Sequence, residues 1–172
     1  MADCLFEASG ATEGGRIPSA RELAAANINP ATGLATDYLN HFNEITMLIG
    51  LVADMPEMID EVRQWRPAGY EQHFERSGFT GRALAIAAYR TARPAVRRAF
   101  EEAIAAFDRA ILALIARLEA AAPERYGEIA GEAETVLPPL MARASGIIHG
   151  VEVDTEILAA DTGQAAVDVL FA

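Results

Sequence analysis

Apolar residues recur at steps of three and four along much of the chain, the period of one face of an α-helix. The first such stretch contains Leu34, Tyr38, Phe42, Ile45, Ile49 and Val52. The second contains Val96, Phe100, Ile104, Phe107, Ile111, Leu114 and Leu118. Its steps approach the heptad spacing of a helix-packing seam. Alternating apolar and polar positions between turn residues, the pattern of a β-strand, are not found. The sequence therefore predicts an all-α fold.

Capping residues and prolines set the limits of the expected helices. Ser19 and Glu22 have the spacing of a capping box. A residue before proline avoids helical angles, so one helix should end before Pro67. The prolines at 138 and 139 should kink or break the last long helix. We expect helices over 20–27, about 30–53, from 54 to before 65, 67–77, 80–92, from 94, from 123, and from 161 or 162 to the end.

These elements predict an antiparallel bundle of about four main helices with short connecting helices. Residues 1–18 mix small and charged residues without periodicity and are expected to form a flexible lead. The bundle domain is expected over 19–150. Residues 151–172 are expected to be a tether followed by an amphipathic helix.

The charge balance bears on the class of partner. The chain has 25 acidic and 14 basic residues, a net charge of −11. A nucleic acid or an anionic membrane surface binds through positive charge, so both are disfavoured as partners. No secretory signal pattern opens the chain, and Cys4 is the single cysteine, which excludes an intramolecular disulfide. We expect a cytoplasmic protein.

The segment ATDYLNHFNE carries polar residues on one helical face. Asp37, His41 and Glu44 are three or four residues apart. A carboxylate and an imidazole at this spacing can bind a metal ion. A solvent-facing histidine can instead accept a phosphoryl group. The third interpretation is a hydrogen-bonded polar face without chemistry. His73 and His149 lie on other segments, and their spacing does not show whether the three histidines converge.

Asp60 is followed four residues later by Gln64. On a helix the two side chains would point the same way. The pair resembles the Asp-x-x-x-Gln motif of the CheZ-type chemotaxis phosphatases. That resemblance implies that Asp60 engages the metal–lysine site of a partner receiver, whose Mg²⁺ the partner supplies, and that Gln64 orients water toward the aspartyl phosphate. No intrinsic cofactor is expected.

The end of the chain resembles the peptide with which flagellar switch proteins and the CheZ tail bind a CheY-like receiver. Five positions match, although Ala165 and Ala166 replace the usual acids. The matching residues are Gln164, Val167, Asp168, Leu170 and Phe171. Three of them form an apolar strip suited to a partner's groove. Separately, the stretch NINPATGLATDYLNHFNE resembles a helical family of alphaproteobacteria, which implies no activity.

Three functions follow, in order of preference. The first is a two-component signalling protein that docks on a receiver and dephosphorylates it. The second is an assembly module without catalysis, a homodimer formed through the 96–118 stripe, although this stripe can equally be buried within one chain. The third is a metal-binding bundle centred on Asp37, His41 and Glu44.

Overall fold

The computed structural model describes residues 18–151, and this part of the chain is helical without a β-strand. Its elements, in chain order, are α1 (Ala20–Ala25), η1 (Thr36–Leu39), α2 (Asn40–Leu51), η2 (Pro56–Met58), α3 (Ile59–Val62), α4 (Tyr70–Arg76), α5 (Arg82–Thr91), α6 (Pro94–Ala120), η3 (Pro123–Arg125) and α7 (Tyr126–His149). The elements written η are short 3₁₀ helices. The all-α prediction is confirmed.

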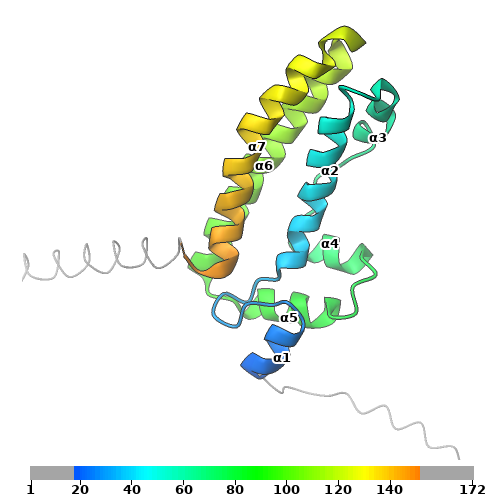
Figure 1. The fold of residues 1–172 in the computed structure, drawn as a ribbon. Helices are drawn as coiled ribbons and strands as arrows, with labels where there is room; N and C mark the ends of the chain where they lie inside the picture. The colour runs from blue at the N-terminus through cyan, green and yellow to red at the C-terminus, as the bar shows by residue number, and fades with distance from the viewer. Residues whose placement is uncertain (1–17, 152–172) are drawn as a thin grey trace, which may run out of the picture.

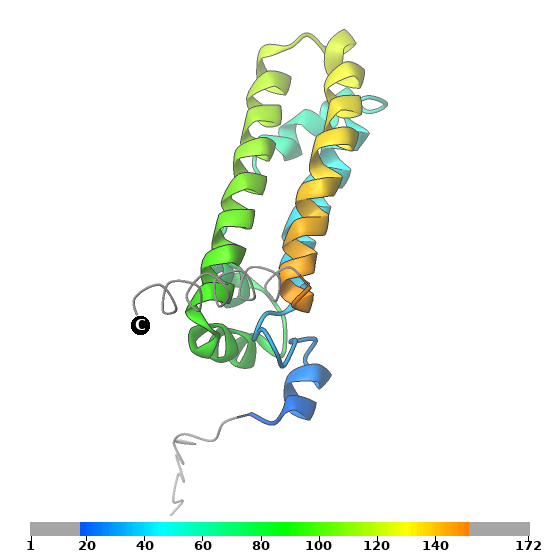
Figure 2. The same ribbon diagram turned by 90° about the vertical axis from the view of Figure 1, so that its left-hand side faces the viewer.

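Three helices, α2, α6 and α7, lie side by side and form the body of the molecule (Figures 1 and 2). Helices α2 and α6 run in one direction and α7 returns in the other. The short helix α3 covers one end, and α1, α4 and α5 gather at the opposite end. In the described range the expected fourth main helix is thus replaced by short helices at the two ends.

Local signals set several helix limits as predicted. The capping box at α1 is present: the backbone N–H of Ser19 donates to Glu22 Oε2 at 2.8 Å, and the N–H of Glu22 donates to Ser19 Oγ at 3.3 Å. The helix before Pro67 ends as expected, with α3 complete at Val62. The helix expected from about 30 begins only at Thr36. Leu34, fully buried, belongs to the preceding loop instead.

That loop is fixed against both α5 and α7. Gly33 has a φ of +73°, and a Cβ there would come within 2.9 Å of the carbonyl oxygen of Ala88. Glycine is required because its backbone reaches this conformation and this close approach without a side chain. Thr32 is buried and its hydroxyl donates to the carbonyl of Ile148 at 2.7 Å. The loop therefore connects the start of α2 to the end of α7.

Of the kink or break predicted at Pro138 and Pro139, the break does not occur. Helix α7 continues from Tyr126 to His149 with both prolines inside it. Both prolines are exposed, whereas the preceding Leu137 is buried. The carbonyls that lose their backbone donors can be hydrated on this outer side, and packing of the inner side keeps the helix together.

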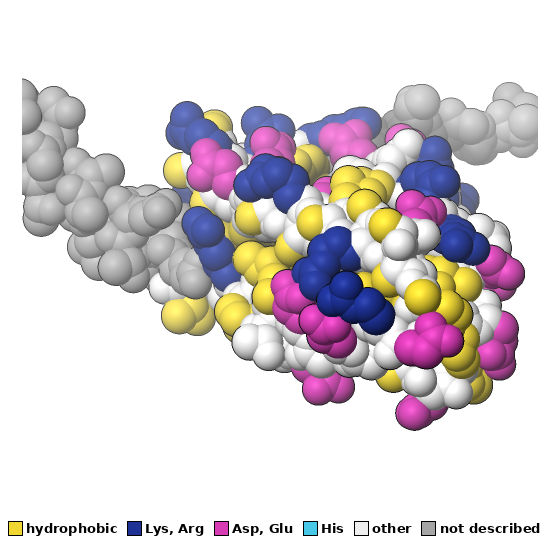
Figure 3. Space-filling model, turned by 90° about the horizontal axis from the view of Figure 1, so that it is seen from above, with side chains coloured by type: hydrophobic (Ala, Val, Ile, Leu, Met, Phe, Trp, Pro, Cys, Tyr) yellow, Lys and Arg dark blue, Asp and Glu magenta, His cyan; other side chains and the backbone are white. Residues whose placement is uncertain are grey.

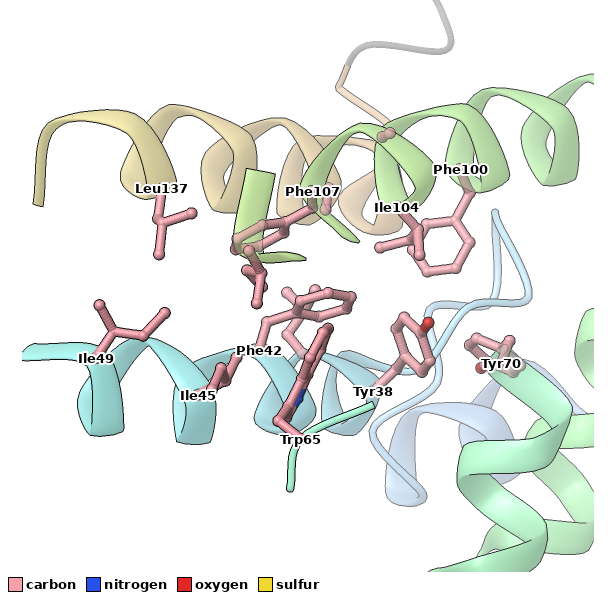
Figure 4. Packing of buried hydrophobic residues seen from close by; sticks show 14 of the residues in the cluster. Tyr38, Phe42, Ile45, Ile49, Trp65, Tyr70, Phe100, Ile104, Phe107 and Leu137 are labelled. Carbon is pink, nitrogen blue, oxygen red and sulfur yellow. The ribbon is translucent and has the colours of Figure 1, made fainter. Parts of the chain in front are cut away.

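One continuous core fills the space between the three long helices (Figure 4). At its centre Phe42 of α2 stacks on Phe107 of α6, with ring centroids 4.4 Å apart. All the apolar positions of the 96–118 stripe are buried within this single chain. The stripe therefore packs inside the fold and does not supply a surface for a second subunit.

The surface of the α3 end mixes both charge signs. Viewed from above, acidic and basic side chains lie next to one another, with apolar side chains between them (Figure 3). The excess of acidic residues thus does not form a single negative patch on this face.

Candidate functional site

Two of the three histidines meet in the folded chain. His41 lies in the first turn of α2 and His73 in α4, and their ring centroids are 5.8 Å apart. His149, the last residue of α7, is exposed, and its Nδ1 lies 2.8 Å from the carbonyl oxygen of Ser145. Packing of α4 against the start of α2 brings the first two together, a contact that spacing along the chain does not reveal.

The two histidines line a groove of about 580 Å³ between α2, the segment after α3, and α4. We call it the histidine groove. Its polar lining consists of Asn40, His41, Glu44, Glu61, Gln64, Arg66, His73, Arg76 and Ser77. The volume is that of a small-molecule site, and the lining contains both signs of charge.

The ring of His41 is held from two sides. It stacks on Trp65, with centroids 4.9 Å apart and planes 23° apart, and it meets Phe42 edge-on. The indole N–H of Trp65 donates to the His41 carbonyl at 3.4 Å. Within the described residues the Nε2 of His41 is buried and has no hydrogen-bond partner. The ring therefore has little freedom to turn toward solvent.

Both imidazoles favour the uncharged form. Burial lowers the pKa of His41 below its ordinary 6.5, and the neighbouring His73 lowers it further, while Glu44 and the backbone of Arg66 act in the opposite direction. Burial also lowers the pKa of His73, and the Asp37 carboxylate partly offsets this. Desolvation disfavours an imidazolium ion, so the uncharged form of both rings is favoured at pH 7.

Asp37 lies beside the site and does not line the groove. It belongs to η1, and in the described structure its Oδ2 is buried without a hydrogen-bond partner. Its charge acts on His73 and on the hydroxyl of Tyr70. Asp37 is thus placed to influence the charge of His73.

The metal hypothesis finds no geometric support. Among residues 18–151 no group of three or more His, Cys, Asp or Glu side chains is arranged to hold a metal ion. Asp37, His41 and Glu44 therefore share a helical face without converging on one point. His41 and Glu44 both line the groove, but Asp37 does not.

The phosphoryl-acceptor interpretation of His41 also meets an obstacle. Transfer requires that a partner approach the attacking nitrogen in line with the phosphoryl group. The Nε2 of His41 is shielded from solvent by its neighbours. His41 is better suited to positioning and electrostatics than to direct attack.

In the folded chain the Asp60 and Gln64 side chains have different partners. Asp60 lies in α3, and its carboxylate pairs with Arg63 at 3.0 Å. Gln64 follows the end of α3, and its side-chain amide donates to the Asp60 carbonyl at 3.1 Å. Gln64 lines the histidine groove and Asp60 does not. The acid and the amide are both exposed.

The residues matched to the receiver-binding peptide lie outside the described residues. These are Gln164, Val167, Asp168, Leu170 and Phe171. Their role remains a prediction.

Several residues of the groove were not singled out from the sequence. Trp65 is the only tryptophan of the chain, and it precedes Arg66 and a proline, a pattern that marks only a helix end. Arg76 is a basic residue in the last turn of a short helix, a common position for arginine that does not indicate a binding site. The one feature of the sequence that could have drawn attention to the groove is the single tryptophan near a helix end, and this feature does not specify a binding site.

Comparisons with models of known protein families, with curated proteins and with solved structures find no match. No helix within residues 18–151 has the length and apolar character needed to cross a bilayer. The expected cytoplasmic location, and the expected absence of nucleic-acid and membrane partners, remain predictions.

Proposed function

We propose that this protein binds a small molecule of mixed charge in the histidine groove, with His73 as an uncharged proton acceptor. The observation that carries the proposal is the meeting of two desolvated histidines in a groove lined by both acids and arginines. Burial keeps His73 neutral and therefore able to accept a hydrogen bond or a proton at neutral pH. His41 and Asp37 act through His73, as positioning residues.

The charged lining indicates the ligand class. Glu44 and Glu61 supply carboxylates to the groove, and Arg66 and Arg76 supply guanidinium groups. One Nη of Arg66 already donates to the carbonyl of Trp65, at 2.7 Å. No ion pair holds Glu44, Glu61 or Arg76 within the described residues, so these groups are available to a ligand. A molecule with a carboxylate and an ammonium group, such as a short peptide, complements this lining.

The single tryptophan provides the readout. Trp65 stacks on His41 in the groove wall, so its fluorescence reports on groove occupancy and on protonation of the imidazole. The probes are alanyl-alanine, its N-acetylated form and its C-amidated form. We expect alanyl-alanine to change the emission of Trp65, and each blocked form to bind at least several-fold more weakly because one charge contact is lost.

Variants localise the effect. His73→Gln should weaken alanyl-alanine binding, whereas His149→Gln, an exposed histidine at the far end of α7, should leave it unchanged. Unchanged Trp65 emission with all three probes up to about 10 mM, a range that detects even weak sites, would overturn the proposal.

Docking on a CheY-like receiver with dephosphorylation is the second candidate. The observation in its favour is that the Gln64 amide lines an open groove while the Asp60 carboxylate beside it is 75% exposed, so a partner protein can reach both. In this proposal Gln64 orients the attacking water, Asp60 engages the receiver, and the receiver supplies Mg²⁺.

A phosphorylated receiver tests the second candidate directly. The intact chain should accelerate phosphate loss, Gln64→Ala should abolish the acceleration, and deletion of residues 162–172 should weaken receiver binding. Equal decay rates with and without the protein would exclude the phosphatase activity. Receiver binding that survives the deletion would exclude the tail as the docking element.

A further inference from the structure

A second cavity, of about 290 Å³, lies where η1, α4, α5 and α6 meet. We call it the tyrosine cavity. The lining residues that matter for its chemistry are Tyr38, Tyr70, Tyr89, Phe100, Glu101 and Asp108. Tyr38 also contacts the histidine groove, because its ring packs edge-on against the ring of His73, with the two centroids 5.3 Å apart. The two sites are therefore neighbours, but they share no lining residue.

Aromatic rings form the walls of this cavity. Tyr38 contacts Tyr70 and Phe100, with centroids 5.3 and 5.5 Å away, and Tyr70 stacks on Tyr89 at 4.4 Å. Tyr38 and Phe100 have almost no solvent exposure, whereas Glu101 is exposed (Figure 4 shows Tyr38, Tyr70 and Phe100). The rings thus form the floor and Glu101 lies at the mouth.

Hydrogen bonds hold the three tyrosines in place. The Tyr38 hydroxyl donates to the carbonyl of Ala68 at 2.7 Å, and the Tyr70 hydroxyl accepts from the N–H of Ala35 at 2.8 Å. The Tyr89 hydroxyl donates to Glu101 Oε1 at 2.6 Å. Because each hydroxyl is engaged, the rings are fixed before any ligand arrives, which reduces the ordering cost of binding.

The charged residues that line the cavity are acids, and one arginine stands beside it. Among its described lining residues are two acids, Glu101 and Asp108, and no Arg or His. The Oδ1 of Asp108 is buried and has no hydrogen-bond partner within the described residues. The guanidinium of Arg97 lies over the Tyr89 ring, 5.9 Å from its centroid, so this ring already has a cation partner of its own.

The geometry points to the tyrosine cavity as a binding site for an organic ammonium ion, with Tyr70 and Tyr89, which keep some exposure, beside its alkyl groups and the Asp108 carboxylate as its counter-ion. Cations are attracted to aromatic faces, and rings arranged around a quaternary ammonium are a known means of recognition. A hard metal ion is a poorer fit, because it needs six or more oxygen ligands and the walls are largely aromatic.

Binding should depend on pH through Asp108. Burial raises the pKa of its carboxyl group to about 6. The groups that line the cavity with it are Glu101 on α6 and the hydroxyls of Tyr38, Tyr70 and Tyr89. The pKa of each tyrosine is raised, chiefly by burial, so these hydroxyls stay neutral in this range. Affinity for a cation should therefore fall as the pH drops through about 6.

Choline and its uncharged carbon analogue, dimethylbutanol, test the site on the full chain. Binding is followed by the amide resonances of Gly69 and Ala105, which line the cavity. We expect choline to bind at least about tenfold more tightly than dimethylbutanol, since both have the same shape and only one is charged. Trp65 emission, which reports on the histidine groove, should not change with choline.

Two variants complete the test. Asp108→Asn keeps the shape, removes the charge, and should weaken choline binding at least about tenfold. Glu134→Gln, at an exposed position of α7, should have no effect. Equal binding of choline and dimethylbutanol would show an apolar cavity without cation recognition and would overturn the inference. No choline shifts at about 10 mM, or full binding by Asp108→Asn, would overturn it as well.

Discussion

The histidine groove and the tyrosine cavity lie next to each other, and burial acts in opposite directions on their titrating groups. In the groove the partly buried groups are bases, so burial lowers the pKa of His41 and His73. In the cavity the partly buried group is an acid, so burial raises the pKa of Asp108. One physical cause, desolvation, therefore shifts the pKa values in two neighbouring sites in opposite directions.

Their charge patterns differ as well. Acids and arginines both line the groove, whereas among the described residues only acids line the cavity. A mixed lining suits a ligand with both charges, and a negative aromatic lining suits a cation. Tyr38 lies at the boundary, because it lines the cavity and contacts His73 of the groove.

Removing Tyr38, the residue at this boundary, should have the largest effect. Tyr38 is fully buried, and Tyr38→Ala should lower the free energy of unfolding by about 3–5 kcal/mol, measured by urea denaturation, because it leaves a large void. It should also shift the NMR titration of His73. Leu137→Ala, a core change on α7, should cost about 2–5 kcal/mol while leaving that titration unchanged. An unaltered His73 titration in Tyr38→Ala would show that Tyr38 does not couple the two sites.

Asp108→Asn should stabilise the protein at pH 7.5, by about 1 kcal/mol after allowance for the solvent that reaches this half-buried group. The sign follows from the pKa, which folding raises from 3.8 to about 6. The charged carboxylate therefore costs stability as the pH rises through this window, and the gain should vanish near pH 4. Thermal unfolding at pH 7.5 and near pH 4 measures this difference in stability, with Glu134→Gln as the control. A destabilised Asp108→Asn at pH 7.5 would contradict the assignment.

The histidines should produce a smaller and opposite pH dependence. Folding lowers the pKa of both rings below 6.5, so their contribution to stability is present above pH 6.5 and is lost as the pH falls through the folded-state values. In the Asp108→Asn background, which removes the opposing carboxylate, stability should fall visibly below pH 6.5. Adding His41→Gln and His73→Gln should flatten that fall, and adding His149→Gln should not.

Gln64→Ala should have the smallest effect on stability, within about 0.5 kcal/mol, because the side chain is exposed on the surface. Urea denaturation checks this value. A loss of ligand or receiver response in this variant would then report on the site itself. A larger change in stability would mean that the Gln64 hydrogen bond to the Asp60 carbonyl holds the end of α3.

The sequence by itself determined the all-α class, the capping box at Ser19, the helix end before Pro67 and the two apolar stripes that enter the core. These features depend on residues close together in the chain. Apolar residues three or four positions apart lie on one face of a helix, and this spacing predicts which side chains face inward. Leu34 shows the limit of that rule, since it continues the spacing but is buried from a loop.

Tertiary structure decided the rest. It kept α7 continuous through Pro138 and Pro139, placed the 96–118 stripe inside the fold, and brought His41 to His73 and Asp108 to the tyrosines. The partners of these residues come from other helices, and spacing along the chain carries no information on which helices will pack together. The pKa shifts follow from the same packing, because they are set by burial and by neighbours that only the folded chain supplies.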